Sequence, residues 1–83
     1  MIEFRYDTQC LLEGEGLDED KINSYIRQNF EGDELLVVGD EELIKLHFHT
    51  NDPWDVLKFM STLGEVFDMV IEDMDRQSRG LQG

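Results

Sequence analysis

The sequence predicts an α+β domain, in which a four-stranded antiparallel sheet carries two helices on one of its faces. Four segments have the alternating or continuous apolar residues of strands, and two have apolar residues every three or four positions, as helices do. Glycines and helix-capping aspartates separate these segments. Their order is strand, helix, strand, strand, helix, strand, which is the order of the ferredoxin-like βαββαβ sandwich. We expect this domain to cover residues 1–74.

The first strand is predicted over residues 2–12, where apolar and polar positions alternate. Its even-numbered side is expected to face the core. Its odd-numbered side, which includes Asp7, should face water or a partner. Two glycines within residues 13–16 then supply the backbone freedom that a turn needs. The even-numbered positions are Ile2, Phe4, Tyr6, Thr8, Cys10 and Leu12.

The first helix is predicted to begin after Asp18, whose side chain can accept hydrogen bonds from the free N–H groups of the first turn. Leu17 and Ile22 have the spacing of a hydrophobic staple across that turn. Gly32 is expected to end the helix. One apolar stripe should therefore pack on the sheet. This stripe consists of Ile22, Tyr25, Ile26 and Phe30.

Residues 35–38 and 43–50 are predicted to pair as a β-hairpin with a tight, glycine-containing turn. In the second of these strands, alternation places His47 and His49 on the outer side, together with Lys45. The inner side should contribute Ile44, Leu46 and Phe48 to the core.

The second helix is predicted to have Asp52 as its capping residue and Pro53 in its first position, where the missing N–H costs nothing. Gly64 should end it. The last strand is predicted over residues 65–73, and the polar residues 75–83 are expected to form a linker to a following domain. The helix should bury Val56, Leu57, Met60 and Leu63, and the strand should carry Phe67, Met69 and Ile71 on one face.

Composition and charge exclude several classes of protein. The chain has 83 residues, with 20 acidic and 7 basic side chains and a formal net charge of −13. One domain of this size leaves no room for a nucleotide-binding fold beside a substrate domain. An acidic surface repels phosphate, so nucleic acid is not expected as a partner. The longest apolar runs are far shorter than the ~20 residues of a membrane helix, so no membrane insertion is expected. A single cysteine excludes an intramolecular disulfide and fits a cytoplasmic location.

Two histidines on one predicted strand, His47 and His49, form the densest cluster of chemically active side chains. They point to the same face and lie about 7 Å apart along the backbone. If the first and third strands are neighbours, Asp7 reaches the same face. Two imidazoles and a carboxylate suit a divalent metal ion, and Asp7 can instead orient a histidine that acts as a general acid or base. The alternative is that both histidines are merely solvated or cover a dimer interface.

Other side chains give weaker signals. No lysine-containing phosphate loop is present, and Ser24 and Ser61 lie on predicted helices without the strained turn of a nucleophilic serine. Cys10 is expected to be a small buried hydrophobe. Trp54 either closes the edge between sheet and helix or anchors a partner.

Four segments are similar to one known family: YDTQ (6–9), LVVGD (36–40), KLHFHTNDP (45–53) and IEDM (71–74). The run His-x-His-Thr-Asn-Asp-Pro is the most specific of them. Over nearly its whole length the chain resembles the central, or linker, domain of bacterial fatty acid kinase large subunits. In those proteins a dihydroxyacetone-kinase-like ATP domain precedes this domain and a DegV-like region follows it. The resemblance implies that the chain is a piece of a longer protein.

The resemblance also implies an accessory domain that makes the kinase a homodimer and contributes to phosphoryl transfer from ATP to a fatty acid held by a DegV-type carrier. The family residues needed for this transfer are two histidines, which match His47 and His49, and a cysteine in a Tyr-Cys-Thr context. Asp7 occupies the position of that cysteine, which favours a metal-ligand or histidine-orienting role over nucleophilic attack. ATP and Mg²⁺ are implied for the parent protein only, and the isolated domain is expected to lack kinase activity.

Three hypotheses follow for the chain. In the first, it is an accessory domain of an acyl kinase with Asp7, His47 and His49 as catalytic residues. In the second, it is a small regulatory module that binds a divalent metal such as Zn²⁺ through the same three side chains. In the third, it is a purely structural dimerisation domain with solvated histidines.

Overall fold

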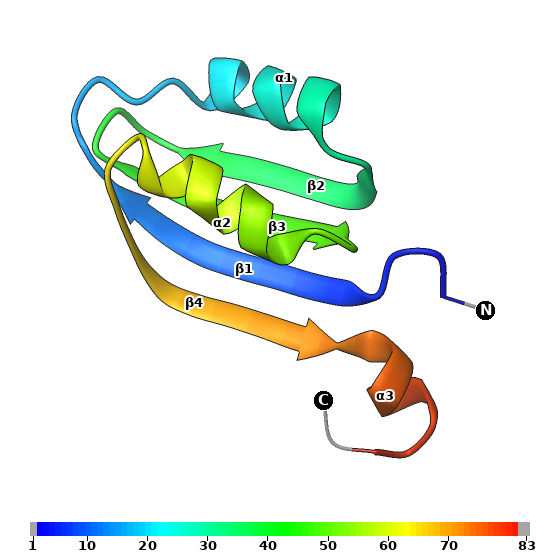
Figure 1. Ribbon diagram of the computed structural model, residues 1–83. Coiled ribbons are helices and arrows are strands. Elements are labelled where there is room, and N and C mark those ends of the chain that lie inside the picture. Colours follow the sequence, from blue (N-terminus) through cyan, green and yellow to red (C-terminus); the bar gives the residue numbers. More distant parts are fainter. Residues whose placement is uncertain (1, 82–83) are drawn as a thin grey trace.

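A computed structural model describes residues 2–81 and confirms the α+β, ferredoxin-like prediction, with α1 and α2 on one face of a four-stranded antiparallel sheet (Figure 1). The strands lie in the order β2-β3-β1-β4, so the first and third strands are the central neighbours. The elements are β1 (Tyr6–Glu13), α1 (Glu19–Asn29), β2 (Gly32–Gly39), β3 (Leu43–Thr50), α2 (Pro53–Ser61), β4 (Glu65–Asp73) and α3 (Met74–Ser78).

The core lies between the sheet and the helices α1 and α2. The even-numbered positions of β1 face it as predicted, because Thr8, Cys10 and Leu12 are at most 2% exposed. The opposite face of the sheet, which no helix of the described residues covers, is called the open face below. The buried hydrophobic residues are Cys10, Leu12, Ile22, Ile26, Val37, Ile44, Leu46, Phe48, Val56 and Met60.

The first strand begins later than predicted. Residues 2–5 alternate in polarity, yet β1 starts at Tyr6, which pairs with Thr50, the last residue of β3. Beyond this pair β3 offers no further partner, so the preceding residues leave the ladder. They are held instead by the side chain of Asn51, which accepts from the Arg5 N–H at 2.7 Å and donates to the Glu3 carbonyl at 3.1 Å.

The start of α1 is as predicted and its end is not. Asp18 caps the helix, and its carboxylate accepts from two backbone N–H groups at 3.0 and 3.1 Å. The helix ends at Asn29, before Gly32, which opens β2 instead. A side chain at Gly32 would collide with the His49 carbonyl. Tyr25 is 44% exposed rather than buried, and its ring stacks on that of Phe59 in α2.

The second helix starts at Pro53 as predicted, but Asp52 does not cap it. The backbone of Asp52 is not extended as a capping residue requires, and its side chain makes no capping hydrogen bond. Its N–H donates instead to the hydroxyl of Thr50 at 3.1 Å. Val56 and Met60 are fully buried.

The last strand has the predicted bounds, but its apolar residues do not share one face. Phe67 pairs with Leu11 on the open face, whereas Ile71 pairs with Thr8 on the core side. A β-bulge at Asp68, whose φ is 50°, inserts one residue between them and reverses the alternation. The prediction of a common face for Phe67, Met69 and Ile71 was therefore wrong.

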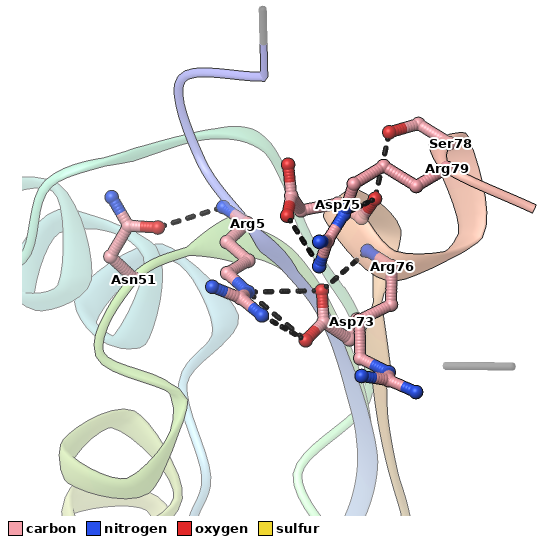
Figure 2. Close-up of polar contacts among 7 residues, drawn as sticks. All are labelled: Arg5, Asn51, Asp73, Asp75, Arg76, Ser78 and Arg79. Atoms are coloured by element: carbon pink, nitrogen blue, oxygen red, sulfur yellow. Dashed lines mark hydrogen bonds and ion pairs between the residues drawn. The ribbon is translucent and has the colours of Figure 1, made fainter. Parts of the chain in front are cut away.

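Where the sequence predicts a polar linker after residue 74, the chain first forms the short helix α3 (Figure 2). Asp73 caps this helix by accepting from the Arg76 N–H at 3.0 Å, and it also binds the guanidinium of Arg5 at 2.8 Å. Arg5 holds the pKa of Asp73 down at about 2. Residues 82 and 83 of the predicted linker lie outside the described residues. No helix within residues 2–81 is long and apolar enough to cross a membrane.

Candidate functional site

The structure brings the three predicted site residues together on the open face. Because β1 and β3 are antiparallel neighbours, Asp7 pairs with His49 and Gln9 with His47. Residues that pair directly across two antiparallel strands point to the same face of the sheet. The sequence alternation that buries Thr8 therefore carries Asp7 outward beside both histidines.

The side chains of the cluster converge on one carboxylate oxygen. Oδ1 of Asp7 lies 3.2 Å from Nε2 of His47 and 3.9 Å from Nε2 of His49. The three side chains are half-buried, with 20 to 27% of their surface exposed. They are thus sheltered from bulk solvent but open to an incoming group on the open face.

Three neighbouring residues make polar contacts with the side chains of the cluster. The amide of Gln9 donates to the two Asp7 carboxylate oxygens at 3.3 and 3.5 Å. On the other side, Nδ1 of His47 lies 3.0 Å from the backbone carbonyl oxygen of Glu34. Asp33 places a carboxylate oxygen 3.7 Å from Nδ1 of His49.

Sequence reasoning did not assign roles to these three residues. Gln9 could have been found, because its odd-numbered position puts it on the same side of β1 as Asp7. Asp33 and Glu34 could not, because the predicted strand began at residue 35 and nothing in the local pattern indicated how β2 meets β3.

Two other candidate residues lie outside the cluster. Cys10 is buried in the core as predicted, and burial raises the pKa of its thiol to about 11. A thiol of that kind is a poor nucleophile at neutral pH. Trp54 is 60% exposed and packs edge-on against Tyr6, with ring centres 5.3 Å apart. It is therefore a surface residue at the end of the sheet where β1 begins.

The donor set of the cluster fits a divalent transition metal. Imidazole nitrogen and carboxylate oxygen are both ligands of Zn²⁺, with bonds of about 2.0–2.2 Å. Ligand atoms of a tetrahedral site with such bonds lie ~3.4 Å apart. One atom from each of Asp7, His47 and His49 lies within 4.8 Å of the others, so only small side-chain movements separate this arrangement from a three-ligand site.

Comparison with known proteins identifies the family of the chain. The family of FakA-like middle domains of fatty acid kinase matches residues 3–81. The chain belongs to this family. The resemblance that the four sequence segments indicated is thereby confirmed, and the matched range includes every residue of the cluster.

Relatives of this FakA-like middle domain occur within longer bacterial proteins. Protein YloV of Bacillus subtilis is 33% identical over 78 residues, which are 92% of this chain and 14% of YloV. An uncharacterized protein of Staphylococcus saprophyticus, SSP1546, is 44% identical over 48 residues, which are 58% of this chain and 9% of that protein. SERP0792 of Staphylococcus epidermidis is 42% identical over the same length. The chain thus spans no more than 14% of these relatives.

Proposed function

We propose that this chain is the accessory domain of an acyl kinase, in which Asp7, His47 and His49 assist phosphoryl transfer from ATP to a fatty acid. The family supports the kinase context. One observation supports the role of the side chains: two imidazole Nε2 atoms lie 3.2 and 3.9 Å from a single carboxylate oxygen on the open face. Such convergence of polar groups is typical of a reaction site.

The chemistry of the cluster matches what this transfer requires. Negative charge spreads over the transferred phosphoryl group, and proteins assist mainly by positioning the reactants and stabilising that charge. The imidazoles of His47 and His49 supply N–H donors to a phosphoryl or carboxylate oxygen, and either can exchange a proton with it. The carboxylate of Asp7 orients the rings and stabilises positive charge on them.

The domain is not a kinase by itself in this proposal. ATP and its Mg²⁺ are held by a dihydroxyacetone-kinase-like domain of the parent protein, and the fatty acid by a DegV-type carrier. The domain also makes the parent a homodimer, which acts in the cytoplasm. The open face is the surface that meets the reacting groups, since it carries both histidines.

Turnover of the parent kinase tests the proposal. Each of His47→Ala and His49→Ala should lower kcat by about 100-fold or more, which is the usual contribution of a positioned acid, base or charge-stabilising group. The matched control is Lys58→Ala, which changes an exposed residue of α2 on the opposite face. Equal turnover of all three variants and the wild type would reject the catalytic role and support a purely structural dimerisation domain.

A divalent-metal site is the second candidate function, and the ligand spacing favours it. One atom from each of three metal-binding side chains lies within 4.8 Å of the others. Calorimetric titration of the isolated chain with Zn²⁺ should show one site that Asp7→Asn weakens. Asp55→Asn, which changes an exposed residue of α2, is the control and should leave binding unchanged. The absence of binding to the wild type near neutral pH would remove this candidate.

A further inference from the structure

The strand β2 is irregular where it passes the site. Its register on β3 shifts between Asp33 and Leu36. Glu34 and Leu35 together therefore lie opposite the single residue Phe48. This is a β-bulge, and Glu34 has a φ of 53°, a left-handed conformation that a residue with a side chain adopts only at a cost.

The bulge directs a backbone carbonyl at His47. The carbonyl oxygen of Glu34 lies 3.0 Å from Nδ1 of the ring. A carbonyl oxygen can only accept a hydrogen bond, so Nδ1 must carry the hydrogen. The opposite ring nitrogen, Nε2, then faces Asp7 at 3.2 Å. The contact to β2 thus decides which nitrogen of His47 is available on the side of the carboxylate.

His49 has the same arrangement with a looser contact. Its Nδ1 lies 3.7 Å from the Asp33 carboxylate, and its Nε2 lies 3.9 Å from Asp7. Asp33 immediately precedes the bulge. Both rings therefore bridge two strands, with Nδ1 directed at β2 and Nε2 directed at β1.

Protection of a sheet edge is the ordinary explanation of such a bulge. Comparison with a second bulge shows which features this explanation accounts for. Both β2 and β4 are edge strands, and edge strands commonly carry bulges that prevent association with other chains. The β4 bulge at Asp68 has nearly the same φ of 50°. Within residues 2–81, however, no side chain donates a hydrogen bond to the Asp68 carbonyl, whereas His47 donates to that of Glu34. Edge protection accounts for both bulges but not for this contact.

We infer that the bulge of β2 is a positioning element of the site, and that Glu34 acts through its backbone carbonyl. The carbonyl fixes the ring of His47 with a hydrogen on Nδ1, so Nε2 is the atom that meets a ligand. Without a hydrogen Nε2 can bind a metal ion or take up a proton, and with a hydrogen it can donate to a phosphoryl or carboxylate oxygen. The purpose of this positioning rests on the proposed function, but the geometry can be tested without it. Second contacts of this kind commonly set the tautomer and orientation of functional histidines.

Nitrogen NMR of the isolated chain tests the geometry directly, because ¹⁵N shifts of an imidazole show which ring nitrogen carries hydrogen. Nδ1 of His47 should carry a hydrogen, with a scalar coupling across the hydrogen bond to the Glu34 carbonyl carbon. Glu34→Gly keeps the carbonyl and suits the positive φ, so it should leave the His47 signals unchanged. A wild-type His47 without hydrogen on Nδ1 would overturn the inference.

A deletion of Glu34 removes the bulge and restores a regular ladder, so it should abolish the His47 coupling. The matched control is a deletion of Asp68, which removes the β4 bulge but should leave His47 as in the wild type. If Nδ1 of His47 couples to another β2 carbonyl carbon after deletion of Glu34, or if its coupling is lost equally in both variants, the β2 bulge does not position the ring. Should either deletion prevent folding, the wild-type and Glu34→Gly spectra still decide the question.

Turnover of the parent kinase separates this inference from the proposed function. Deletion of Glu34 should lower kcat by about 10-fold or more, without a matching change in KM. Correct NMR signals together with full activity of His47→Ala would reject the proposed function and leave the positioning geometry intact. Loss of activity in His47→Ala together with hydrogen absent from Nδ1 would do the reverse.

Discussion

Two threonines of the sheet are fully buried but differ in their hydrogen bonds, so replacing each by valine should change stability in opposite directions. Thr8 and Thr50 are both 0% exposed. Among the described residues, the hydroxyl of Thr8 has no hydrogen-bond partner. The hydroxyl of Thr50 donates to the Glu31 carbonyl at 2.8 Å and accepts from the Asp52 N–H at 3.1 Å.

The magnitudes follow from these contacts. Valine has nearly the shape of threonine, so Thr8→Val removes a buried hydroxyl that nothing satisfies and should raise the free energy of unfolding by about 1 kcal/mol. Thr50→Val removes two hydrogen bonds of roughly 1 kcal/mol each, so it should lower the free energy of unfolding by about 2 kcal/mol. For a domain of this size, these changes correspond to Tm shifts of about 5 °C upward and about 10 °C downward.

Urea unfolding of the isolated chain, followed by circular dichroism, measures both variants against the wild type. The slope of the free energy against urea should stay constant, which shows that only stability has changed. A Thr8→Val variant that is destabilised as much as Thr50→Val would contradict this prediction, since the Thr8 hydroxyl would then have a stabilising partner.

Three further predictions concern charged groups and the cysteine. The ion pair with Arg5 lowers the pKa of Asp73 from 3.8 to about 2, so its stabilisation is complete above about pH 4 and disappears as the pH falls towards 2. Acid should therefore destabilise Asp73→Asn less than the wild type, and equal acid sensitivity in unfolding experiments would count against the ion pair. With its pKa at about 11, Cys10 should react with iodoacetamide at pH 8 only after unfolding, and rapid labelling of the native chain would contradict its burial. Asp18→Ala should lower the unfolding free energy by about 1 kcal/mol and Asp52→Ala by much less, because only the first carboxylate caps a helix; similar losses in urea unfolding would show otherwise.

The sequence was sufficient for the fold and for the clustering of three side chains on one face of the sheet. Alternation is a local property, so it could assign Asp7, His47 and His49 to the outer sides of their strands from the residue pattern alone. The order of the elements then made the first and third strands neighbours, because the split βαβ arrangement places them at the centre of its sheet. These two inferences together bring the three side chains into one cluster.

The bulges could not be predicted, because they depend on register and backbone conformation rather than on local pattern. Glu34 and Asp68 have positive φ values, yet neither is a glycine that would have indicated a left-handed residue. Missing the β4 bulge led to the wrong prediction that Phe67, Met69 and Ile71 share one face. Missing the β2 bulge hid the contact between the Glu34 carbonyl and His47.

The predicted start of the first strand and the predicted cap of the second helix were wrong for a related reason. A local sequence pattern forms the expected structure only where the fold supplies the groups with which it pairs. Residues 2–5 have the alternation of a strand, but β3 ends at Thr50 and leaves them nothing to pair with. Asp52 precedes a helical proline, but its backbone conformation keeps the carboxylate away from the free N–H groups. For α3 the signal was present: Asp73 is a capping residue and Asp75 an acidic residue of the first turn.

A double-mutant cycle on the parent kinase measures whether Asp7 and His47 act as one unit. The measurement compares kcat of Asp7→Asn, His47→Ala and the double variant with that of the wild type. Residues that act together lose their function once, so the double variant should be no slower than the slower single variant. Two independent losses that multiply in the double variant, or wild-type turnover in all three, would contradict a shared role of the cluster in phosphoryl transfer.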